Sequence, residues 1–247
     1  MSVVFVHGVL DTYRLWDRVR QQLSRTDIVA LSLPGFNSPV PDGFTATKEE
    51  YVDWIIDQLE RQTDPIDLVG HDWGCILSVR VASLRPDLVR TWAAGSGPIS
   101  GDYEWHDLAK IWQTPVVGEQ WMTSLDQDEL SHVIKGYGVP ADIAMEMAGR
   151  MDETMKDCIL RLYRSAVNVG SEWETGLADI TSPGLVFWGV SDPACPVEFA
   201  DRLGKDTKAA RVIKLECGHW TPIERPNEIA QILQEHWKGN IPAPSRK

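Results

Sequence analysis

Basic residues are scarce in this chain. It carries 24 Lys and Arg against 36 Asp and Glu, a formal net charge of −12. This balance argues against a nucleic-acid groove and against binding to an anionic membrane surface. No apolar run approaches the roughly 18 residues that span a bilayer, and Met1–His7 lacks the basic start of a secretion signal. We therefore expect a soluble, cytoplasmic protein with no nucleic-acid and no membrane partner.

A metal-binding or disulfide pattern of cysteines is also lacking. The four cysteines show no C-x-x-C spacing, which argues against zinc and dithiol chemistry. Four cysteines in 247 residues are too few for a disulfide scaffold. We expect no metal and no cofactor. The length suits one domain, with or without an insertion, and leaves a homodimer open.

Short apolar runs alternate with helical patterns along most of the chain. The runs are nearly continuous in Val, Ile and Leu, as expected for parallel strands that are buried on both faces. This alternation predicts a mostly parallel, doubly wound α/β sheet. The predicted strands are Val3–His7, Ile28–Leu33, Ile66–Gly70, Thr91–Ala94, Gly184–Gly189 and Arg211–Leu215. The predicted helices between them are Leu15–Leu23, Lys48–Arg61, Gly74–Leu84, Val197–Leu203 and Asn227–Trp237.

One interval, residues 98–179, contains helical patterns and no convincing strand. Its predicted helices are Trp105–Trp112, Asp128–Ile134, Ala141–Met151 and Glu153–Val169. Open α/β sheets bind their ligands at the carboxyl ends of the strands, so we expect this insertion to lie there as a lid. The predicted division is therefore a core of residues 1–97 and 180–247 with a helical lid of residues 98–179.

The sequence Gly70-His71-Asp72-Trp73-Gly74 joins a predicted strand to a predicted helix. Strand, Gly-x-X-x-Gly turn and helix form the nucleophile-elbow pattern, in which the middle residue projects from the strand's end. That residue is usually Ser, and here it is Asp72. An aspartate that attacks a saturated carbon forms an ester, which water can cleave. Asp72 is equally suited to cap the following helix, so the motif alone leaves both roles open.

Two further strand ends supply partners for Asp72. Asp192 follows the strand Gly184–Gly189, and His219 follows Arg211–Leu215. Nucleophile, acid and histidine then appear in the chain order of an elbow hydrolase, with His219 as base and Asp192 holding its ring. The backbone amides of Val9 and Trp73 are expected to form an oxyanion hole. His7 is interpreted as a structural residue.

These motifs resemble the α/β-hydrolase superfamily, specifically its epoxide hydrolase branch, with haloalkane dehalogenases as close relatives. The elbow is common to both groups. The segment Cys217-Gly218-His219-Trp220-Thr221 resembles the catalytic-histidine segment of soluble epoxide hydrolases, and Leu162-Tyr163-Arg164 resembles the segment with a ring-opening tyrosine. The resemblance extends from Val3 to Trp237 and implies that Tyr163 is catalytic. Its helical face also allows Tyr163 to be a core residue.

The chain departs from the family in three places. Leu10 replaces a proline of the H-G-x-P loop, and the two edge strands that usually precede this loop are expected to be missing. The family generally has a second lid tyrosine, where this chain has Trp105, His106, Leu108 and Trp112. Tyr103 or Tyr137 could substitute for it. We expect the substrate pocket to include Trp105, His106, Trp112 and Trp220.

The resemblance implies an enzyme that opens small apolar epoxides to 1,2-diols through an ester on Asp72. A haloalkane dehalogenase with the same Asp-His-Asp triad is the alternative. A fluoroacetate-type dehalogenase is disfavoured, because Trp73 stands where that group has an Arg. A further alternative is a hydrolase-fold receptor that binds a small apolar ligand without turnover.

Overall fold

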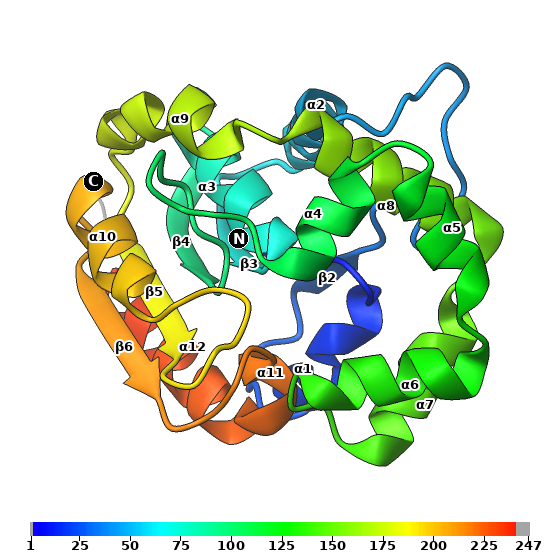
Figure 1. Cartoon of the computed structure of the whole chain (residues 1–247). Coiled ribbons are helices and arrows are strands. Elements are labelled where there is room, and N and C mark those ends of the chain that lie inside the picture. Colours follow the sequence, from blue (N-terminus) through cyan, green and yellow to red (C-terminus); the bar gives the residue numbers. More distant parts are fainter. Residues whose placement is uncertain (1, 241–247) are drawn as a thin grey trace, which may run out of the picture.

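The computed structural model describes residues 2–240, and its centre is a six-stranded sheet (Figure 1). The strand order is β2-β1-β3-β4-β5-β6, and every neighbouring pair is parallel. All six predicted strands are confirmed, with ends that shift by at most two residues. No strand precedes β1 within the described residues. The strands are β1 (Val3–Val6), β2 (Ile28–Leu31), β3 (Ile66–His71), β4 (Val89–Gly95), β5 (Gly184–Gly189) and β6 (Arg211–Leu215).

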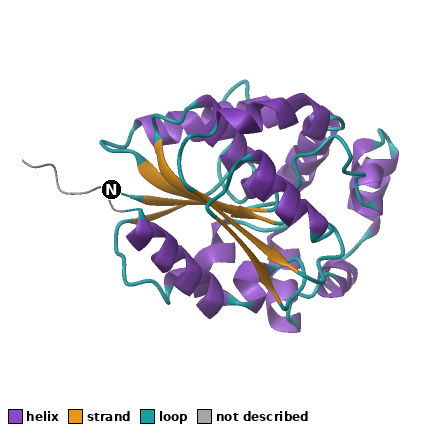
Figure 2. Cartoon of the chain, turned by 90° about the vertical axis from the view of Figure 1, so that its left-hand side faces the viewer, coloured by secondary structure: helices purple, strands orange, loops and turns teal. Residues whose placement is uncertain are grey.

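Helices cover both faces of this sheet (Figure 2), which confirms the doubly wound arrangement. The predicted helix Leu15–Leu23 is wrong as a single element: a 3₁₀ turn, η1 (Tyr13–Trp16), leads into a short α1 (Asp17–Arg20). Apolar spacing does not distinguish these two kinds of turn, because both bury the same face. The other core helices are α2 (Lys48–Glu60), α3 (Trp73–Leu84), α10 (Glu198–Asp206), α11 (Thr221–Glu224) and α12 (Pro226–Gly239).

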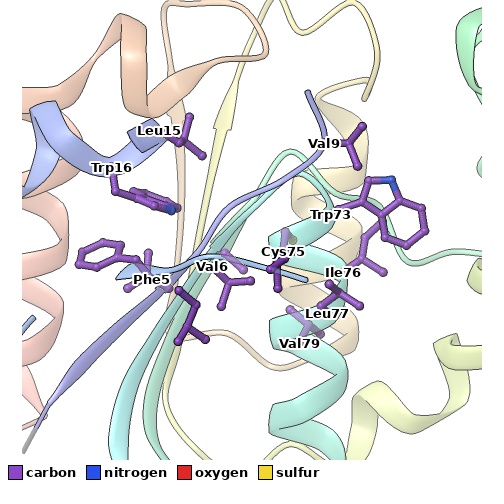
Figure 3. Close-up of a cluster of buried hydrophobic side chains, with 14 of the residues drawn as sticks. Phe5, Val6, Val9, Leu15, Trp16, Trp73, Cys75, Ile76, Leu77 and Val79 are labelled. Atoms are coloured by element: carbon purple, nitrogen blue, oxygen red, sulfur yellow. The ribbon is translucent and has the colours of Figure 1, made fainter. Parts of the chain in front are cut away.

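The central strands are buried on both faces. Every residue of β1, β3 and β5 is buried, which explains their nearly continuous apolar runs. Figure 3 shows the cluster around β1, in which the rings of Phe5 and Trp16 lie 4.8 Å apart. Each large side chain buried in this way contributes about 1.5–3 kcal/mol. This packing fixes the carboxyl ends of the strands, from which the candidate site projects.

Residues 98–179 form the helical insertion, and no strand is described within them. It is joined to the core by polar contacts: Lys48 Nζ donates to the Ser165 carbonyl at 2.7 Å, and Arg150 pairs with buried Asp11 at 3.3 Å. The elements are α4 (Asp107–Gln113), α5 (Val117–Ser124), α6 (Gln127–Gly136), α7 (Ala141–Arg150), α8 (Glu153–Ser165), α9 (Val169–Trp173) and η2 (Glu174–Asp179). Figure 1 shows α5, α6 and α7 set apart from the strands of the sheet. The sequence missed α5, α9 and η2.

The division into a core and a lid remains a proposal about how these parts act. Met1 and residues 241–247, which that division assigns to the core, lie outside the described residues. Among residues 2–240, no helix has both the length and the apolar character needed to cross a bilayer.

Candidate active site

Asp72 lies at the turn between β3 and α3 in a strained backbone conformation. Its φ of 56° and ψ of −123° are rare for a residue with a side chain. The turn is tight because Gly74 packs against β1: a Cβ at this glycine would lie 2.2 Å from the Val6 carbonyl oxygen. The Asp72 side chain makes no capping hydrogen bond to α3. The Asp72 carboxylate therefore does not cap α3, and it is available for another role.

His219 lies between two carboxylates. Its Nε2 atom is 3.6 Å from Asp72 Oδ2, and its Nδ1 atom is 2.9 Å from Asp192 Oδ2. Asp192 is held in turn by the backbone N–H groups of Ala194 and Cys195, which donate to its Oδ1 at 2.9 and 2.8 Å. The Trp220 ring stands edge-on to the imidazole, with centroids 5.3 Å apart. The structure thus brings the three predicted residues together and limits the rotation of the His219 ring.

The charges of these three groups depend on one another. Burial would lower the pKa of His219, but the charge of Asp192 and the hydrogen bonds to Asp192 and Asp72 raise it well above its usual 6.5. Burial would raise the pKa of Asp72, but its interactions with His219 lower it. The pKa of Asp192 is lowered in the same way. At neutral pH the site therefore holds two carboxylates and one imidazolium.

Backbone amides lie beside the Asp72 carboxyl group. The Val9 N–H donates to Asp72 Oδ1 at 2.7 Å, and the Trp73 backbone N–H lowers the pKa of Asp72. Figure 3 shows Val9 and Trp73 near the same end of the sheet. Leu10 has a φ of 70°. A proline ring fixes φ near −65°, so the usual proline could not occupy this loop in its present form.

His7 contacts the loop and not the nucleophile. Its Nδ1 atom lies 2.8 Å from the Gly8 carbonyl oxygen, and its Nε2 atom accepts the Leu33 N–H at 3.1 Å. Complete burial lowers its pKa to about 4. The ring is therefore neutral and occupied at both nitrogens, as a structural residue would be.

A cavity of about 400 Å³, part of it open to solvent, lies above Asp72 between the sheet and the helical insertion. Seven of its lining side chains carry a nitrogen or oxygen atom, and the other five are hydrocarbon. The lining residues are Val9, Leu10, Asp72, His106, Leu108, Trp112, Ile134, Tyr137, Tyr163, Ala194, His219 and Trp220.

Tyr163 projects from α8 into this cavity. Its ring is surrounded by tryptophans, with centroids 4.9 Å from Trp112 and 5.2 Å from Trp73. Burial and the nearby charge of Asp72 raise the pKa of its hydroxyl well above 10, so the hydroxyl keeps its proton. Tyr163 is thus a buried residue, as its helical face allowed, and also a lining residue near Asp72.

The remaining predicted pocket residues divide into two groups. His106, Trp112 and Trp220 line the cavity. Trp105 does not: its ring stacks on Trp73 at 5.8 Å, and its indole N–H donates to the Val167 carbonyl at 3.1 Å. Trp105 is therefore placed behind the pocket wall. Sequence reasoning did not select Ile134 or Ala194, for which no motif gives a signal.

One group of metal-ligating side chains overlaps the site. Asp192, Cys195 and His219 place one ligand atom each within 4.8 Å of one another, and all three are buried. Asp192 and His219 already form a hydrogen bond, and burial raises the pKa of the Cys195 thiol to about 12. The thiol therefore stays protonated at neutral pH.

Comparisons with known proteins identify a family and a fold. The family model described as "Alpha/beta hydrolase family" matches residues 3–232. The (E)-2-((N-methylformamido)methylene)succinate hydrolase of Acinetobacter baylyi is 21% identical over 94% of this chain and 88% of its own length. Epoxide hydrolase 1 of Caenorhabditis elegans is 22% identical over 96% of this chain and 63% of its own. A haloalkane dehalogenase variant from Bradyrhizobium elkanii superposes with a TM-score of 0.76 at 19% identity, over 96% of this chain and 90% of its own. These proteins carry out different reactions, so the comparisons leave the substrate open.

Proposed function

Because the chain belongs to the alpha/beta hydrolase family, we propose that it hydrolyses epoxides to 1,2-diols through a covalent ester on Asp72. One observation carries this proposal. A carboxylate, and not a hydroxyl, stands at the elbow with His219 at 3.6 Å and the Val9 amide at 2.7 Å. A carboxylate nucleophile suits attack on a saturated carbon, because the ester it forms can be hydrolysed by the same site.

In the first step, Asp72 attacks a ring carbon of the epoxide. A bond forms between Asp72 Oδ2 and carbon while the bond from that carbon to the epoxide oxygen breaks. The leaving oxygen is an alkoxide and needs a proton, which Tyr163 supplies from its lining position. The high pKa of this hydroxyl keeps the proton available at neutral pH.

In the second step, water attacks the ester carbonyl. His219 accepts a proton from this water, and the amides of Val9 and Trp73 stabilise the oxyanion. Collapse of the tetrahedral intermediate then breaks the bond between the Asp72 carboxyl carbon and the ester oxygen, which takes the remaining proton of the water and leaves as part of the 1,2-diol. Esterification removes the negative charge beside Nε2, so the pKa of His219 falls and the ring releases a proton. Solvent carries this proton to the Tyr163 phenolate and restores its hydroxyl. His219 can therefore act as a base only after the ester has formed. Asp192 retains its hydrogen bond to Nδ1 throughout and stabilises the imidazolium that forms again.

The helical insertion, in this proposal, acts as a lid that excludes bulk water and selects the substrate. Leu108, Trp112 and Ile134 come from it and give the cavity an apolar wall. Small apolar epoxides fit such a surface. A charged substrate would lose its hydration without gaining an ion pair, since the charged groups at the site already neutralise one another in part.

A haloalkane dehalogenase is the second candidate. The observation that favours it is the indole of Trp112, which lines the cavity and whose N–H finds no partner among residues 2–240. A buried N–H without a partner is costly and could bind a departing halide. A halide needs no proton, so Tyr163 would be dispensable in that reaction.

The experiment is mass spectrometry of the peptide containing Asp72 in His219→Gln, after exposure to styrene oxide or 1-bromohexane. The variant should form the ester and fail to hydrolyse it. A hydroxyalkyl adduct supports the epoxide reaction, and an alkyl adduct formed only from the bromide supports the dehalogenase. His236→Gln, a change of a buried histidine on α12, is the matched control and should accumulate no adduct. Absence of any adduct in His219→Gln contradicts covalent catalysis by Asp72.

A further inference from the structure

The loop after β1 carries the Val9 amide in a strained conformation. Its next residue, Leu10, has a φ of 70°, which is unfavourable for a residue with a side chain. The loop also packs closely on the nucleophile, because a Cβ at Gly8 would lie 2.2 Å from Asp72 Oδ1. Backbone of this kind persists only where the surrounding structure fixes it. The position of the Val9 amide therefore depends on contacts made further along the loop.

Asp11 joins this loop to the helical insertion. Its side chain is buried, and its Oδ1 atom accepts the Thr12 backbone N–H at 2.7 Å and an N–H of the Arg150 guanidinium at 3.3 Å. One carboxylate oxygen thus contacts both the backbone of the loop and a side chain of α7. Burial raises the pKa of Asp11 to about 6, so the carboxyl group is charged at neutral pH and pairs with Arg150 as an ion.

Arg150, the last residue of α7, is itself anchored to the core. Its carbonyl oxygen accepts the side-chain N–H of Asn37, in the loop after β2, at 2.9 Å. Asn37 also lies 3.4 Å from Asp152, the N-cap residue of α8. The other carboxylate near the guanidinium is Glu146, which is 3.5 Å away and 71% exposed. An exposed pair of this kind contributes little, so the guanidinium stays with Asp11.

We propose that Arg150 is a positioning residue for the oxyanion hole: by binding Asp11, it holds the loop after β1 in the form that directs the Val9 N–H at Asp72. The insertion would then serve the ester-cleaving half of the reaction in addition to covering the cavity. This role rests on the ester of the proposed function, because the Val9 amide meets an oxyanion only when water attacks that ester. It is the same whether an epoxide or a halide formed the ester.

The two steps should respond differently when this contact is lost. In the first step Asp72 loses its charge, so the hydrogen bond from Val9 weakens as the reaction proceeds, and a displaced amide does not hinder the attack. In the second step Oδ1 of the same residue gains charge, and the amide must be in place to stabilise it. A general loosening of the fold would instead slow both steps.

The test uses Arg150→Met at pH 8, because methionine has a similar aliphatic length and no N–H donor. With His219 intact, single-turnover hydrolysis of the ester from styrene oxide should slow by about 10-fold, a part of the roughly 100- to 1,000-fold lost with a whole oxyanion donor. In the His219→Gln background, formation of the adduct should change little. Arg161→Met, which removes the arginine of an exposed ion pair on α8, is the matched control and should alter neither step.

A second variant tests the same contact from the core side. Asp11→Asn keeps an oxygen for the Thr12 N–H and removes the charge that binds Arg150. It should slow ester hydrolysis by a smaller factor, and it should have no effect when added to Arg150→Met, because both changes act on one contact. Full additivity of the two changes would overturn the proposal, as would equal slowing of both steps by Arg150→Met.

Hydrogen exchange of the Val9 amide, followed by NMR of the ligand-free protein, does not depend on turnover. Exchange should be about 10-fold faster in Arg150→Met than in the wild type and unchanged in Arg161→Met. If Arg150→Met does not fold, Asp11→Asn takes its place in this measurement. An unchanged exchange rate refutes the positioning role. Absence of any adduct in His219→Gln refutes the proposed function instead, so the two failures are distinguishable.

Discussion

The pKa of His219 should fall when Asp72 is replaced by Asn, because the variant lacks the charge that stabilises the imidazolium. Asp72 Oδ2 lies 3.6 Å from His219 Nε2, and both side chains are largely shielded from water. Two unit charges about 4 Å apart interact by about 4 kcal/mol at an effective dielectric constant of about 20. Losing this attraction destabilises the imidazolium relative to the neutral ring, so the pKa of His219 falls. Asn preserves the shape of the side chain and removes only its charge.

The assay is a pH titration of the His219 ring by ¹⁵N NMR, with the signal assigned from His219→Gln. Asp157→Asn is the matched control: it removes the same charge from an exposed ion pair with Arg161 on α8 and should leave the titration unchanged. An unchanged or raised pKa of His219 in Asp72→Asn would refute the coupling. It would also refute the proposal that ester formation converts His219 into a base, because esterification removes the same charge.

Three other changes test the site and its surroundings. Tyr163→Phe in the His219→Gln background should slow adduct formation from styrene oxide by about 100-fold or more, and an unchanged rate would exclude the tyrosine as the acid. A Cβ at Gly8 would lie 2.2 Å from Asp72 Oδ1. Gly8→Ala should therefore displace the carboxylate and slow adduct formation by about 100-fold. An unaltered rate would show that the loop after β1 moves to accommodate the added methyl group. Burial raises the pKa of Asp11 from 3.8 to about 6, so the folded chain holds this proton where the unfolded chain has released it. The free energy of unfolding should therefore fall by about 3 kcal/mol as pH rises from about 4 to about 6. Urea unfolding at a series of pH values should show a smaller fall in Asp11→Asn. The same pH dependence in the variant and the wild type would contradict a raised pKa of Asp11.

The strands and the order of the candidate catalytic residues were predictable because both depend on local sequence. A parallel strand buried on both faces must be apolar along its length, and a side chain just after such a strand emerges at the carboxyl edge. Asp72 and Asp192 follow the fully buried strands β3 and β5, whereas His219 follows β6, an edge strand that is only partly buried. Their approach in space follows from the parallel sheet, in which β3, β4, β5 and β6 are successive neighbours.

The helical insertion was less predictable, because its helices start without strong local signals. α5 begins after Val116, which makes no capping hydrogen bond and has a φ of 71°. Val116 and Val117 are exposed, so the apolar pattern does not mark a buried face either. By contrast, α6 begins with a capping box at Asp126 and Glu129, and its position was predicted. Trp105 was predicted in the substrate pocket and lies behind its wall. No local signal could have shown this, because its partners Trp73 and Val167 are distant in the chain.

The properties that give the site its chemistry depend on distances between segments far apart in sequence. His219 is expected to be protonated before the reaction and basic after it because one carboxylate, 147 positions earlier in the chain, lies 3.6 Å away and loses its charge on becoming an ester. The residue types were visible in the sequence and their protonation states were not. For a nucleophile that must first attack as a carboxylate and then be released as an ester, that state decides whether the second step can follow the first.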